Sequence, residues 1–107
     1  MWTVSSNNIT MVEGDFGISL PIVVSGITFA SGDEIKLSIL KKINGGIEIV
    51  GKTFTNIQNN TINLELTEQE SSLLHAGTYV YRLDWYQNGV FMCNIIPSAP
   101  FKVVEKA

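Results

Sequence analysis

The amino-acid sequence predicts an all-β protein: an antiparallel β-sandwich of about seven or eight strands with one short helical turn near residues 67–75. Three observations predict this class. Apolar residues recur at every second position in most of the chain, turn-forming clusters separate these runs, and only one segment has a helical pattern. The chain has 107 residues, of which 45% are apolar and 16% charged, so we expect one core and a single domain over 1–107.

Five runs show the alternation of a half-buried strand, in which successive side chains point to opposite faces. They cover residues 16–24, 35–39, 62–66, 79–86 and 101–104. Pro21 lies in the first run, and because proline cannot donate to a strand ladder we expect an edge strand or a bulge there. Asn-Gly-Gly at 44–46 and Gln-Asn-Gly at 87–89 predict hairpin turns, the second between strands near 77–86 and 89–96.

The segment "LTEQESSLLHAG" departs from the period of two. Thr67 and Glu70 have the spacing of a capping box, and Leu73 and Leu74 follow. We therefore expect one helical turn or slightly more, closed by Gly77.

Composition excludes several classes of partner. The formal net charge is −3, and the basic residues are scattered, so we expect neither nucleic acid nor an anionic membrane as a partner. No apolar stretch reaches the roughly 18 residues of a membrane span, and the N-terminal residues lack the pattern of a signal peptide. Cys93 is the only cysteine, which suits a reducing compartment, and its apolar surroundings predict a buried, inert thiol.

One stretch matches a nucleotide-binding motif letter for letter. Residues 46–53 read Gly-x-x-x-x-Gly-Lys-Thr, the pattern of a phosphate loop. A phosphate loop must open a helix, yet the free positions are rich in β-formers, one of them is Glu48, and turn residues follow Thr53. We favour a Gly-Gly turn, a strand over 47–50, a bulge or kink at Gly51 and a solvated Lys52, with no bound cofactor.

No catalytic group can be assembled from the sequence. His75 is the only histidine, and a surface or capping role is the favoured interpretation over a metal or triad role. Four acidic residues lie at turns, where solvated carboxylates are favoured over a calcium site: Glu13, Asp15, Asp33 and Glu34. We expect no enzyme activity and no metal.

Aromatic residues around the 87–89 turn are the best candidates for function. Tyr79, Tyr81 and Trp85 share one strand face and are expected in the core. Tyr86 and Val80 lie on the opposite face, and together with Val90 and Phe91 they make the candidate interaction surface. Packing or a subunit contact is favoured there over a ligand platform.

The motif "AGTYVY" resembles the E–F corner of immunoglobulin-like sandwiches. The resemblance implies that Tyr79 forms a tyrosine corner, its hydroxyl bonding to backbone upstream. Tyr81 stands where antibody-type domains place a disulfide cysteine, so the chain departs from the disulfide-bonded family.

The order of motifs along most of the chain resembles small sandwich domains of tailed-bacteriophage or prophage baseplate and tail proteins. The matching residues are Gly14-Asp15, Gly32-Asp33, Leu74-x-x-Gly77-x-Tyr79-x-Tyr81 and Phe101-x-Val103. The resemblance implies a structural virion protein without catalysis or cofactor, found in the virion or in the bacterial cytoplasm during assembly. Its partners would be copies of itself or other virion proteins. The alternative is a carbohydrate-binding or adhesin module that uses the same aromatic residues.

Overall fold

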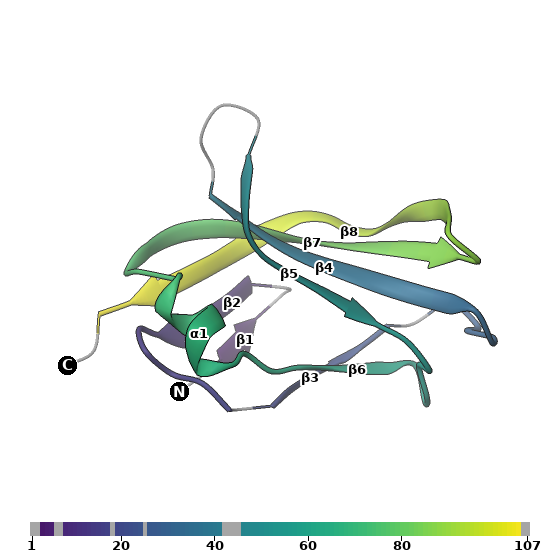
Figure 1. The fold of residues 1–107 in the computed structure, drawn as a ribbon, viewed down its shortest axis with the longest axis horizontal. Coiled ribbons are helices and arrows are strands. Elements are labelled where there is room, and N and C mark those ends of the chain that lie inside the picture. Colours follow the sequence, from purple (N-terminus) through teal and green to yellow (C-terminus); the bar gives the residue numbers. More distant parts are fainter. Residues whose placement is uncertain (1–2, 6–7, 18, 25, 42–45, 106–107) are drawn as a thin grey trace.

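The protein is an all-β sandwich with two layers of very different size (Figure 1). The computed structural model describes residues 3–5, 8–17, 19–24, 26–41 and 46–105. The strands and the helix are β1 (Thr3–Ser5), β2 (Asn8–Val12), β3 (Leu20–Val23), β4 (Asp33–Lys41), β5 (Ile47–Phe54), β6 (Thr61–Leu64), α1 (Glu68–Ser72), β7 (Gly77–Gln87) and β8 (Val90–Val104). The eight described strands confirm the predicted class.

The larger layer is a sheet with the order β1-β2-β8-β7-β4-β5, and the smaller layer pairs β3 with β6. Apolar side chains from both layers fill the space between them. The fully buried members include Ile35, Leu37, Ile39, Leu64, Leu83 and Phe101. Tyr81 packs edge-on against Phe101, with ring centroids 6.2 Å apart, so the aromatic face predicted for β7 does form part of the core.

The N-terminal third differs from the prediction. Of the described residues in the run 16–24, Leu20–Val23 form a strand, and among the described strands this one pairs with β6. Pro21 therefore lies in an edge strand, as predicted. β1 and β2 were not predicted. β2 pairs in parallel with the end of β8, from Ile9–Phe101 to Val12–Val104, so the large sheet is not purely antiparallel.

The strand β8 is a single strand where two were predicted. Its pairing with β7 changes register at three places, which leave Met92, Ile95 and the pair Pro97–Ser98 without a partner position in β7. Such bulges increase the local twist of a strand. Asn88 and Gly89 form the predicted turn with φ of 49° and 82°. β4 and β5 pair antiparallel, and residues 42–45 of their predicted turn lie outside the described residues.

The short helix and the strand after it confirm two local predictions. The Thr67 side chain accepts from the Glu70 N–H while the Glu70 carboxylate accepts from the Thr67 N–H, which completes the capping box. The Tyr79 hydroxyl donates to the His75 carbonyl at 2.9 Å, the bond expected of a tyrosine corner. Gly77 does not close the helix: α1 ends at Ser72, and Gly77 is the first residue of β7.

Candidate interaction surface

The stretch that matches the phosphate loop lies in a strand. Residues 47–54 form β5 and pair with β4, so Gly51 and Lys52 open no helix. The register shift lies between Ile39 and Leu40, so the bulge in β5 is at Ile49 and the prediction of a bulge at Gly51 was wrong. The Glu48 carboxylate lies over Gly51, 3.1 Å from where a Cβ would stand. A negative group therefore occupies the position where an anion would have to bind.

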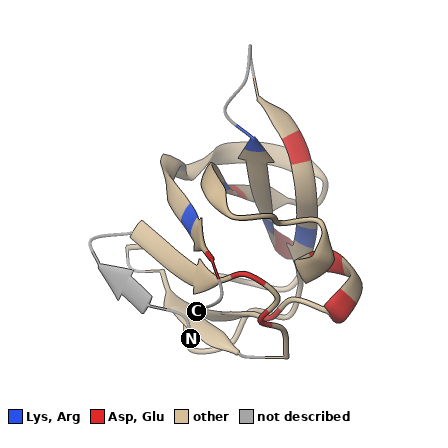
Figure 2. Ribbon diagram, turned by 90° about the vertical axis from the view of Figure 1, so that its left-hand side faces the viewer, with Lys and Arg blue, Asp and Glu red and all other residues tan. Residues whose placement is uncertain are grey.

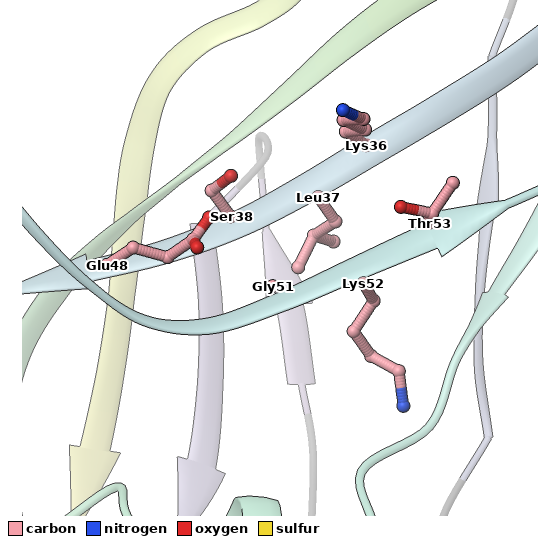
Figure 3. A pocket seen from close by; sticks show the side chains of 7 residues that line it. All are labelled: Lys36, Leu37, Ser38, Glu48, Gly51, Lys52 and Thr53. Carbon is pink, nitrogen blue, oxygen red and sulfur yellow. The ribbon is translucent and has the colours of Figure 1, made fainter.

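The hollow beside this stretch, about 280 Å³ in volume, lies on the outer side of the large sheet (Figure 3). Glu48 reaches over it toward Ser38, while Lys36 and Thr53 border it. Lys52 also borders the hollow, but its side chain extends to the other side of β5 (Figure 3). The Lys52 ammonium therefore does not point into the hollow, as phosphate binding would require.

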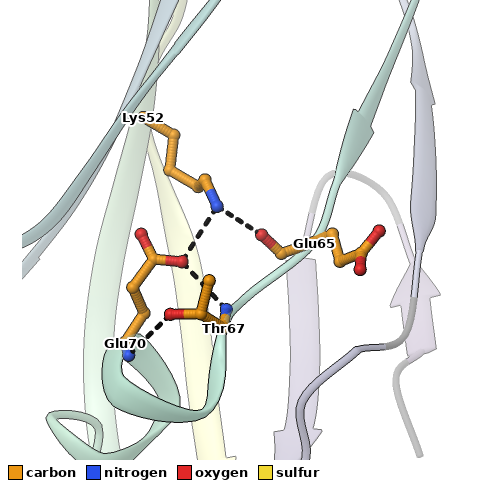
Figure 4. A network of polar contacts seen from close by, with 4 residues as sticks. All are labelled: Lys52, Glu65, Thr67 and Glu70. Atoms are coloured by element: carbon orange, nitrogen blue, oxygen red, sulfur yellow. Dashed lines mark hydrogen bonds and ion pairs between the residues drawn. The ribbon is translucent and has the colours of Figure 1, made fainter.

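Lys52 instead joins β5 to the capping box (Figure 4). Its Nζ donates to the Glu70 carboxylate at 2.9 Å and to the Glu65 carbonyl at 2.5 Å. Only 23% of the Lys52 side chain is exposed, so the prediction of a solvated lysine was wrong. Burial raises the pKa of Glu70, but hydrogen bonds from the Thr67 backbone and from Lys52, together with the lysine charge, lower the pKa overall. This network is structural, because every polar group in it already has a partner.

Other residues singled out in the sequence form no reactive cluster. His75 is exposed, as predicted, and its Nδ1 lies 3.8 Å from the Glu13 carboxylate. Asp33 is buried and accepts from the Ala30 N–H at 2.7 Å, so the prediction of a solvated acid was wrong for this residue. Within the described parts of the chain, no three His, Cys, Asp or Glu side chains are grouped to hold a metal ion.

The tip of the β7–β8 hairpin exposes consecutive apolar side chains. Val90, Phe91 and Met92 are 63%, 50% and 43% exposed. Phe91 lies opposite Tyr86, with ring centroids 5.6 Å apart. We call Tyr86, Val90, Phe91, Met92 and Cys93 the hairpin surface. The tip lies at the opposite end of the long axis from α1 (Figure 1).

The structure brings together three of the four residues predicted for this surface. Tyr86 and Phe91 are paired on one face of the tip, and Val90, paired with Gln87, lies on the other face of the same tip. Val80 lies six residues back along β7, about 20 Å away at a strand's rise per residue, and it is partly buried opposite Pro100. Val80 therefore does not belong to the hairpin surface.

The sequence did not predict two features of this region. Cys93 is exposed, so the prediction of a buried thiol was wrong. Among the described strands only β7 pairs with β8 at Cys93, because β2 pairs with β8 only from Phe101 to Val104. Trp85 is half-buried and packs edge-on against Phe29, with ring centroids 6.0 Å apart, so it lies at the margin of the core. Only the distribution of charge signals this exposure in the sequence: residues 85–101 carry no charged side chain.

Charged residues gather elsewhere. Figure 2 faces the α1 end of the molecule and marks acidic residues on the helix, where Glu68 and Glu70 occupy the first turn. Acidic side chains are favourable at that position, since a helix N-terminus carries partial positive charge. The two ends thus differ in composition: α1 presents acidic side chains, whereas residues 85–101 of the hairpin carry none and have only the β4 residues Asp33, Glu34 and Lys36 as charged neighbours in the pairing and ring contacts described.

Comparison of the chain with protein-family models, with curated proteins and with solved structures found no match. Of the helical residues that the structure describes, none belong to a helix long and apolar enough to cross a membrane.

Proposed function

We propose that the protein is non-catalytic and acts by binding other proteins through the hairpin surface. The observation that carries this proposal is the exposure of three large apolar side chains, Val90, Phe91 and Met92, at a hairpin tip where residues 85–101 carry no charge. Scattered exposed apolar residues are normal on soluble proteins, but a contiguous group is typical of an interaction site. Removing these side chains from water on docking supplies the driving force.

The assembly that we propose is the tail or baseplate of a bacteriophage or prophage. The order of the Gly-Asp, Leu-x-x-Gly-x-Tyr-x-Tyr and Phe-x-Val motifs supports this proposal, and the sandwich fold agrees with it. The partners would be copies of the chain or other virion proteins. A protein of this kind works by position and contact, so it needs no reactive group.

The contacts of Tyr86 favour protein docking over the alternative of carbohydrate binding. A sugar stacks on an open aromatic face, whereas the Lys36 ammonium lies 4.6 Å from the centroid of the Tyr86 ring. Phe91 meets the same tyrosine at an interplanar angle of 69°, so the two rings form no common flat platform. An edge-on aromatic pair of this kind suits insertion into an apolar pocket of a protein.

The test is co-expression of the protein with the products of its neighbouring genes, followed by affinity capture of a tagged chain. We expect the wild-type protein to retain a tail or baseplate component and Phe91→Glu to lose it. Phe16→Glu is the matched control, because Phe16 is also 50% exposed and the charge change is the same. Undiminished capture by Phe91→Glu would contradict the proposal, as would hydrolysis of a phosphate ester that Lys52→Ala abolishes.

A further inference from the structure

We infer that the hairpin surface binds the hairpin surface of a second copy of the chain, around a two-fold axis. This inference rests on the proposed function and names one partner for it. Most soluble oligomers are closed and symmetric, and in a two-fold interface the same residues contribute from both chains. A surface that pairs with itself must be free of uncompensated charge, present apolar side chains, and have a shape that two copies can share.

The charge distribution favours a copy of the same surface over other parts of the chain. No charged side chain occurs between Asp84 and Lys102. The other exposed large apolar residues of the described chain are separate in sequence: Phe16, Val23, Ile47 and Leu73. A head-to-tail contact would therefore place the hairpin on a mixed or charged surface and desolvate those charges. A two-fold contact sets the apolar residues Val90, Phe91 and Met92 of one chain against those of the other, with the Lys36 ammonium already placed against the Tyr86 ring.

The unpaired edge of β8 gives two copies of the chain a way to pair with each other. From residue 90 to 99, β8 pairs with β7 on one side, and no described strand pairs with it on the other. Two such edges run antiparallel when they meet at a two-fold axis, the arrangement in which strand edges bond most directly. The unpaired positions at Met92 and Ile95 twist the edge, which limits the ladder to a short segment. The side chains of Val90, Phe91 and Met92 then carry most of the contact.

The place of Cys93 makes this arrangement testable. Cys93 is exposed and lies in the middle of the uncharged run 90–96. In an antiparallel pairing centred on this run, the two copies of Cys93 lie across the axis from each other. Because the chain has no second cysteine, any thiol cross-link joins two molecules.

The first measurement is sedimentation velocity over a range of protein concentrations under reducing conditions. We expect a reversible monomer–dimer equilibrium for the wild-type protein and a dissociation constant at least about tenfold higher for Phe91→Glu. Phe16→Glu keeps the wild-type dissociation constant, because it makes the same change at an equally exposed phenylalanine. Unchanged thermal melting of both variants establishes that the fold is retained.

The second measurement is cross-linking with a short bis-maleimide, read as dimer on a denaturing gel. We expect cross-linked dimer at concentrations where the protein self-associates, much less for Phe91→Glu, and none for Cys93→Ser. Sedimentation as a monomer at about millimolar concentration would overturn the inference, as would a dimer that Phe91→Glu leaves intact.

The outcomes separate this inference from the proposed function. A monomeric wild-type protein that still captures a tail component through Phe91 refutes the self-pairing and leaves the proposed function standing. A Phe91-dependent dimer that captures no virion component supports the self-pairing and counts against the virion role.

Discussion

The two ends of the sandwich satisfy their side chains in opposite ways. At the α1 end, Lys52, Thr67 and Glu70 form a closed set of hydrogen bonds, and the Tyr79 hydroxyl bonds to the His75 carbonyl. At the other end, the hairpin leaves apolar side chains in water. A polar group that is already paired gains little from a new partner, whereas an exposed apolar group gains by being covered. The α1 end therefore stabilises the fold, and the hairpin is the surface that we propose for binding.

The largest expected effect comes from breaking the core beneath α1. Leu74 follows the helix and is 1% exposed. Leu74→Ala removes its methyl groups from the core and leaves a cavity, so we expect a loss of about 2–5 kcal/mol in the free energy of unfolding. Urea denaturation followed by circular dichroism measures it. A loss under 1 kcal/mol would mean that α1 is not held to the core through Leu74.

The tyrosine corner is expected to contribute less. Tyr79→Phe keeps the ring and deletes the hydroxyl that bonds to the His75 carbonyl. We expect a loss of about 0.5–1.5 kcal/mol, the usual net value of one hydrogen bond. The same denaturation experiment applies, and Tyr86→Phe serves as the control, because that change at the hairpin should leave stability unaltered. Equal losses of unfolding free energy for Tyr79→Phe and Tyr86→Phe would contradict the view that the α1 end stabilises the fold more than the hairpin does.

The contribution of Glu70 should depend on pH. Although burial raises the pKa of Glu70, the bonds from Thr67 and Lys52 lower it below its ordinary 4.5 overall. A carboxyl group with a lowered pKa in the folded state stabilises above its unfolded pKa, and this gain is lost as pH falls through the folded pKa. The stability difference between wild type and Glu70→Gln should thus be greatest near about pH 7 and vanish toward about pH 3. A difference that stays constant over this range would show that the charge of Glu70 contributes nothing.

The smallest effect on stability is expected at the hairpin surface. Phe91→Ser removes a half-exposed ring that packs on Tyr86 and lies outside the hydrophobic core cluster, so we expect a change within about 0.5 kcal/mol. The same substitution should weaken partner binding strongly. A large loss of stability would assign Phe91 to the fold instead of to a binding surface.

Local patterns predicted the local structure well. The alternation around Ile35 and Leu64 marked buried strand faces, Thr67 and Glu70 marked the helix start, and Asn88–Gly89 marked the hairpin. Each of these depends on residues a few positions apart, so the chain itself contains the required information. The tyrosine corner was predicted from the resemblance to immunoglobulin-like sandwiches. A local motif could carry this prediction, because the bond from Tyr79 to His75 spans only four residues.

Features that depend on the second layer or on distant strands were not predictable in this way. The exposure of Cys93 depends on where β2 stops pairing with β8, about eighty residues away in sequence, and no local pattern states that. Lys52 resembled a solvated strand residue because its partners Glu65 and Glu70 come from another segment. Period-two alternation separates the two faces of a strand, but it does not say whether a face is covered.

The continuity of β8 has a mechanical consequence. One unbroken strand leads from the hairpin tip to the four positions where β8 runs beside β2, from Phe101 to Val104. Tension applied at the tip along this strand loads its ladders with β7 and then with β2 in shear, so that the ladder bonds share the load and do not open one after another. A load on the hairpin surface, which we propose binds a neighbour, would thereby be transmitted toward the opposite end of the molecule.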